Sequence, residues 1–112
     1  MELTGECAKA FERWYRNPLG TDEPRWTNWN GTDLYSIETF HRLDESMQYG
    51  VYVDFFDSVG IECIAYKRRE SYSFEAGLHF DKNTTIGYRD TLHEARTAAI
   101  DKANEIFNNQ NK

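Results

Sequence analysis

Apolar positions recur every three or four residues at the start of the chain: Leu3, Cys7, Phe11 and Trp14. This spacing predicts an amphipathic helix of about three turns. Thr4 is the expected N-cap. The helix is expected to end at Asn17, because Pro18 disfavours helical backbone in the residue before it.

The segment between residues 33 and 60 is harder to assign. Asp33 is expected to cap a short helix that carries Leu34, Ile37, Phe40 and His41. Residues 47–59 then fit two patterns: Met47, Val51, Phe55 and Val59 share a helical face, whereas Tyr49, Val51, Val53 and Phe55 alternate as in a strand. We interpret this segment as a helix, because Gly60 and the preceding acidic residues are typical of helix ends.

From Gly60 onward the pattern changes to period two. Apolar and polar residues alternate over 61–66, 72–80 and 84–88, which predicts three strands separated by turns at 67–70 and 81–83. Thr91 and Glu94 form a capping box for a last helix over 92–107. One face of that helix is apolar: Leu92, Ala95, Ala99, Ala103 and Ile106. The sequence therefore predicts a single α+β domain over 1–112, with N-terminal helices, a three-stranded antiparallel meander and a C-terminal helix packed on the sheet.

Composition supports a folded, soluble chain. The 112 residues are 39% hydrophobic and 15% aromatic, an aromatic content that disordered chains lack. No apolar run approaches the roughly 20 residues of a membrane span, and no secretion signal is visible at the N-terminus. Cys7 and Cys63 are too few for a disulfide framework and lack metal-ligand spacing. We therefore expect a cytoplasmic protein with no membrane association, no metal and no cofactor.

The charge is unevenly distributed. The net charge is −6, and residues 1–62 hold twelve acidic but only five basic residues. Nucleic-acid binders have the opposite balance, because phosphate neutralisation supplies much of their affinity. The helix–three strands–helix order resembles the double-stranded-RNA-binding domain, but Glu94 and Asp101 oppose Arg96 and Lys102 where that domain places a lysine cluster. We expect no direct nucleic-acid binding and instead a protein partner with a basic surface.

The candidate partner-binding residues combine aromatic and acidic side chains, a mixture typical of protein-binding surfaces. They are Trp26, Trp29, Asp44, Glu45, Tyr49, Tyr52, Asp54 and Asp57. The alternative for the two tryptophans is that they fill the core beneath their loop.

The sequence also contains residues suited to three other kinds of site. Lys67, Arg68 and Arg69 with nearby tyrosines are the candidate site for a nucleotide phosphate, which is the alternative function. Asp54 and Asp57, with Glu45 or His41, are the candidates for a metal-dependent enzyme. Cys63 with His79 would be a nucleophile pair, but the alternation places Cys63 among core residues and no third orienting group is identifiable. The sequence therefore favours a protein without catalytic residues.

Two segments, SMQYGVYVDFFDSVGI and HEARTAAIDKANEIFN, resemble small uncharacterised proteins encoded by phages and prophages. The resemblance covers about a quarter of the chain and brings no catalytic residues with it. It implies an accessory protein acting inside a bacterial cell. Some phage proteins of this size and acidity inhibit host nucleases, CRISPR effectors among them, by occupying basic nucleic-acid channels. By that analogy, inhibition of a defence nuclease is the specific expectation.

Overall fold

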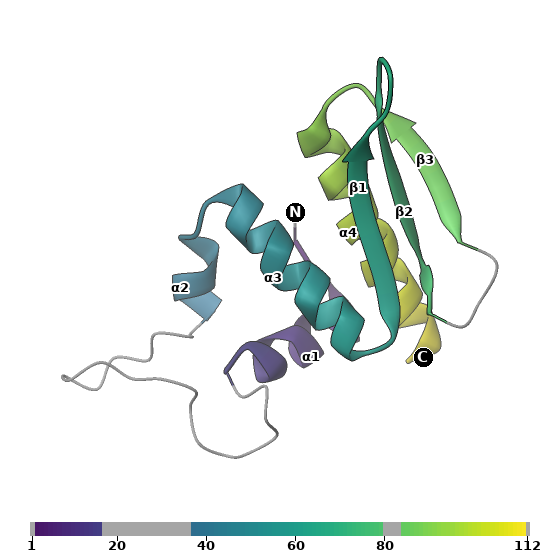
Figure 1. Cartoon of the computed structure of the whole chain (residues 1–112). Helices are drawn as coiled ribbons and strands as arrows, with labels where there is room; N and C mark the ends of the chain where they lie inside the picture. The colour runs from purple at the N-terminus through teal and green to yellow at the C-terminus, as the bar shows by residue number, and fades with distance from the viewer. Residues whose placement is uncertain (1, 17–36, 80–83, 112) are drawn as a thin grey trace.

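The computed structural model describes residues 2–16, 37–79 and 84–111. Its elements are α1 (Gly5–Arg16), α2 (Ile37–His41), α3 (Glu45–Ser58), β1 (Ile61–Lys67), β2 (Tyr72–Leu78), β3 (Thr85–Arg89) and α4 (Leu92–Gln110). The sheet is antiparallel in the order β1-β2-β3, and α4 covers one of its faces (Figure 1). The predicted α+β fold is confirmed, and the three strands lie within one or two residues of their predicted bounds. No helix among the residues described is long and apolar enough to span a membrane.

The contact between α4 and the sheet is built from small side chains. Ala95, Ala99 and Ala103 are fully buried on α4 and face a sheet surface that includes Cys63 and Ala76. The absence of bulk at these positions lets the helix approach the strands closely. The hydroxyl half of the predicted capping box is also present, since Thr91 Oγ1 accepts a hydrogen bond of 3.1 Å from the Glu94 amide. The predicted apolar face of this helix is confirmed.

A second part of the core is an aromatic cluster where α1, α2 and α3 meet. Phe11 stands at its centre, with its ring centroid between 4.8 and 6.1 Å from five other rings. Those five are Trp14, Tyr15, Phe40, Tyr52 and Phe55. Several pairs are tilted or edge-to-face, the geometry that aromatic quadrupoles prefer. This cluster joins α2 and α3 to the N-terminal helix.

The N-terminus of α1 is capped by α4. The Cys7 amide donates to Asn108 Oδ1 over 2.9 Å, and Asn108 Nδ2 donates to the Thr4 carbonyl over 3.0 Å. Asn104 Oδ1 accepts from the Thr4 amide over 2.9 Å, while its Nδ2 donates to the Thr4 hydroxyl. Thr4 holds the expected N-cap position, since its carbonyl accepts from the Ala8 amide over 3.2 Å. The side chain that accepts from the exposed helix amide of Cys7 is nevertheless that of Asn108, about a hundred residues away. This arrangement ties the two ends of the described chain together.

We expect Asn108→Ala to destabilise the protein by about 1–2 kcal/mol, because it removes the acceptor of an orphan helix amide. Thermal unfolding followed by far-UV circular dichroism measures the effect. Asn109→Ala is the matched control, because Asn109 is the next residue of the helix and its own side chain is exposed. Equal stability of the two variants would show that the tertiary cap contributes nothing.

Residues 45–58 form a helix, as interpreted from the sequence, and Gly60 follows with a φ of +83°. Of the four residues that share the helical face noted in the sequence, only Phe55 is fully buried. Met47 is 54% exposed and Val59 is 38% exposed, while the fully buried side chains are Tyr52, Phe55 and Phe56. The reason is that α3 carries apolar residues on every side, so tertiary packing selects which of them are covered.

Candidate functional site

The acidic residues predicted to bind a partner gather on α3 and just before it. We call Asp44, Glu45, Met47, Asp54 and Asp57 the α3 surface; all five side chains are exposed. No lysine or arginine occurs between Leu43 and Tyr66, so no basic side chain from this segment neutralises the surface. At 1.5 Å rise per residue, its carboxylates extend over about 20 Å along the helix.

Local sequence fixes both ends of α3. The Asp44 carbonyl accepts the first helical bond, from the Gln48 amide over 2.9 Å, and Gln48 Nε2 donates back to the Leu43 carbonyl. At the other end the Val59 and Gly60 amides donate to the carbonyls of Phe56 and Asp57. The positive φ of Gly60 is a conformation that glycine adopts without strain, and it turns the chain into β1.

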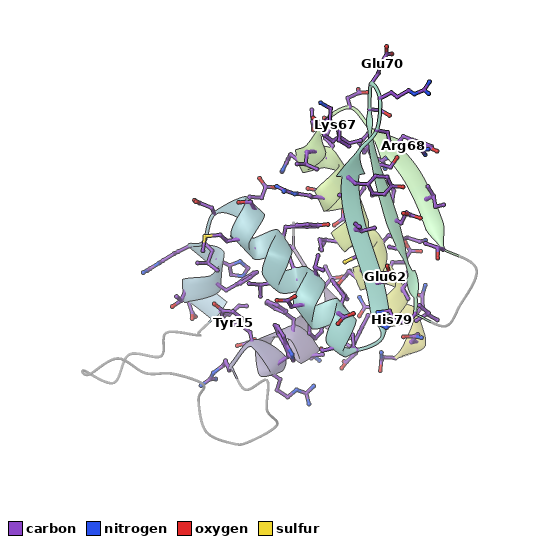
Figure 2. The ribbon with its side chains drawn as sticks, viewed as in Figure 1. Tyr15, Glu62, Lys67, Arg68, Glu70 and His79 are labelled. Carbon is purple, nitrogen blue, oxygen red and sulfur yellow. The ribbon has the colours of Figure 1, made fainter. Side chains whose placement is uncertain are left out.

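Two histidines contact the carboxylates near the ends of α3. His93, near the start of α4, pairs with Glu45, and His79, just after β2, lies with Nε2 3.2 Å from Asp57 Oδ1. Figure 2 shows His79 at the end of the sheet that receives the chain from α3. Despite these contacts the Asp57 side chain is 74% exposed and that of Glu45 is 46% exposed. Asp54, between them in sequence, has no ion pair among the residues that the structure describes.

The aromatic residues predicted to anchor a partner lie elsewhere. Tyr52 is 1% exposed within the aromatic cluster, and burial raises the pKa of its hydroxyl to about 12. Its predicted place at a contact surface was wrong, because the ring faces Phe11 and Phe40. Trp26 and Trp29 lie outside the described residues.

Tyr49 is half-buried and has a structural role. Its hydroxyl accepts a 3.0 Å hydrogen bond from the Ala65 amide, on an edge strand of the sheet. The Arg96 guanidinium lies 5.1 Å from the centre of its ring. Burial is the main cause that raises the pKa of Tyr49, with the neighbouring Cys63 adding to the rise. Tyr49 thus joins α3 to β1 and α4 and is not free to anchor a partner.

Of the basic residues proposed for a phosphate, Lys67 ends β1, and Arg68 and Arg69 lie in the exposed turn that leads to β2. Figure 2 labels Lys67 and Arg68 at this end of the sheet. The Arg68 amide closes the turn by donating to the Ser71 carbonyl over 2.8 Å. Its guanidinium bends onto the sheet, where Nη1 donates to the Tyr88 hydroxyl over 3.3 Å. Lys67 and Arg69 are exposed beside it.

The structure does not bring together the candidate catalytic groups. Burial raises the pKa of the Cys63 thiol to about 12, with Glu62 adding to the rise, so the sulfur is a neutral thiol at physiological pH. The cross-strand neighbour of Cys63 is Ala76, and His79 contacts Asp57 instead. Among the described residues, Asp54 and Asp57 are not part of any group of three side chains able to hold a metal ion.

The sheet face opposite α4 carries exposed apolar side chains that were not among the residues predicted to bind a partner. Ile64, Ile86 and Tyr88 are exposed there, at 43%, 54% and 55%. A signal was present: Ile64 and Tyr66 occupy the positions of their strand that alternate with the core residues, where polar side chains are usual.

The comparisons with known proteins add no assignment. No protein-family model matches the chain, and no curated protein or solved structure is significantly similar to it. The case for a function therefore depends on the residues themselves.

Proposed function

We propose that this protein is a non-enzymatic binding protein of a phage type that docks its α3 surface against a basic surface of a bacterial host protein. The observation that carries the proposal is the set of four exposed carboxylates on and just before α3, which no lysine or arginine of this segment neutralises, together with the exposed Met47. Carboxylates arranged this way accelerate encounter with a positively charged partner, and an exposed apolar side chain among them adds contact area.

A host defence nuclease is the specific target in this proposal. Enzymes of that class carry basic channels for nucleic acid, and carboxylates held on a folded helix would compete with the phosphates for such a channel. Helix α3 is suited to this because its position is held by the aromatic cluster, by Tyr49 and by the two histidine contacts. A preorganised surface loses less entropy on binding than a flexible one.

The test is an affinity capture from host lysate at low salt and near 1 M salt, where the screening length falls to about 3 Å. Partners found only at low salt are identified by mass spectrometry, purified and measured against a variant carrying Asp44→Asn, Glu45→Gln, Asp54→Asn and Asp57→Asn. We expect the variant to associate at least about tenfold more slowly. Amides at these positions preserve shape, so the change isolates charge.

The matched control replaces two exposed carboxylates of α4, as Asp101→Asn and Glu105→Gln. This variant loses two negative charges, half as many as the α3 variant, and keeps the α3 surface intact, so we expect it to bind like the natural protein. Undiminished binding by the fourfold α3 variant would overturn the proposal. Binding to nucleotides through Lys67, Arg68 and Arg69 remains the alternative, and a thermal shift with a nucleotide panel tests it.

A further inference from the structure

The sheet face opposite α4 has two ends of opposite charge. Figure 1 looks onto this face, with α4 behind the strands. The strand register arranges its side chains in cross-strand rows, about 7 Å apart. From the end near His79 toward the hairpin these rows are Glu62–Gly77, Ile64–Glu75–Ile86 and Tyr66–Ser73–Tyr88, with Arg68 beyond them.

Arg68 belongs to this face because its guanidinium reaches Tyr88, by a hydrogen bond and by a position 5.9 Å from the ring centre. Glu62 and Arg68 therefore mark the acidic and basic ends, and Figure 2 shows them at opposite ends of the sheet. Between them lie the exposed side chains of Ile64, Ile86 and Tyr88. Exposed apolar side chains gathered on one sheet face are typical of an interface.

We propose that this open sheet face binds the same face of a second copy of the protein, around a two-fold axis that runs across the strands. The axis passes between the isoleucine row and the tyrosine row. Each isoleucine row then covers a tyrosine row of the other copy, and Glu62 of each copy meets Arg68 of the other. Because the axis reverses the strand direction, acidic ends meet basic ends.

The charges at the two ends also distinguish this register from the other face-to-face arrangement. A two-fold axis along the strands would instead set β1 of each copy over β3 of the other. Glu62 and Arg68 would then lie at opposite ends of the interface and could not pair.

The size of the face sets the strength of the dimer. Three strands and four rows give on the order of 300 Å² of sheet plane per copy, well below the ~800 Å² per partner of a standard stable interface. We therefore expect a reversible dimer with a dissociation constant on the order of 0.1–1 mM. Sedimentation equilibrium over concentrations on both sides of that range measures it.

The decisive experiment is a charge exchange. Arg68→Glu and Glu62→Arg should each weaken dimerisation by roughly three- to tenfold, and the double variant should restore it, because each new pair is again of opposite sign. Ile86→Glu should abolish dimerisation, since it places a carboxylate in the apolar centre. Asp101→Arg, an exposed charge reversal on α4, is the control and should leave the dissociation constant unchanged.

Each variant is checked for folding by circular dichroism, so that a loss of association is not a loss of structure. A protein that stays monomeric at the highest concentration overturns the proposal. So does a dimer that survives Ile86→Glu, or a double variant that fails to recover association. None of these outcomes depends on a host partner, so this experiment tests the dimer independently of the proposed function.

Discussion

Phe11→Ala is expected to destabilise the protein by about 3–5 kcal/mol, the usual range for removing a fully buried phenylalanine. Phe11 is 2% exposed and lies within about 6 Å of five aromatic rings from α1, α2 and α3. Its loss leaves a cavity where the three helices meet. Domains of this size have 5–15 kcal/mol of total stability, so the variant should lose a large share of it and melt roughly 10–20 °C lower.

Urea unfolding followed by tryptophan fluorescence and circular dichroism measures this change. Met47→Ala is the control, because Met47 is an exposed apolar residue of α3 and its truncation should stay within about 0.5 kcal/mol. Phe11→Leu should fall between the two, since it retains most of the buried volume but loses the ring contacts. A Phe11→Ala variant as stable as Met47→Ala would contradict the central place of Phe11 in the core.

The second large effect is expected at Gly87, the β3 partner of Phe74. A Cβ atom at Gly87 would lie 2.4 Å from Phe74 Cε1 and 2.6 Å from Cζ, far inside van der Waals contact. The Phe74 ring is 6% exposed and has the Arg89 guanidinium 5.0 Å from its centre, so it has little room to move away. Gly87→Ala should therefore destabilise the protein by about 1–3 kcal/mol.

A double-mutant cycle separates this clash from other effects of the substitution. The φ of Gly87 is not positive, so its backbone conformation permits alanine, and the expected loss is steric. Phe74→Leu removes the two ring atoms that would collide, and in that background Gly87→Ala should be nearly neutral. We expect a coupling free energy of at least about 1 kcal/mol from thermal or urea unfolding. The same cost in both backgrounds would locate the effect in the backbone.

The candidate site was predictable in its charge but not in its aromatic anchors. Charged carboxylates are rarely buried, so their residue type alone predicts that Asp54 and Asp57 lie on the surface. Both are exposed in the structure. Tyrosine is amphipathic and occurs both in cores and at interfaces. Only the packing of α3 against α1 and α2 shows that Tyr52 belongs to the core and that Tyr49 binds the edge of β1.

By itself the sequence determined the elements whose signals are local. Period-two alternation defined β1, β2 and β3, and the Thr91 cap with its alanine face defined α4, because these patterns depend on neighbours within a few residues. Tertiary structure alone decided which side of α3 is buried, since apolar residues occur on every side of this helix and its sequence marks no single apolar face. It also supplied the Asn108 acceptor at the start of α1, because Asn108 lies about a hundred residues from Cys7 and no local pattern encodes a hydrogen bond over that separation.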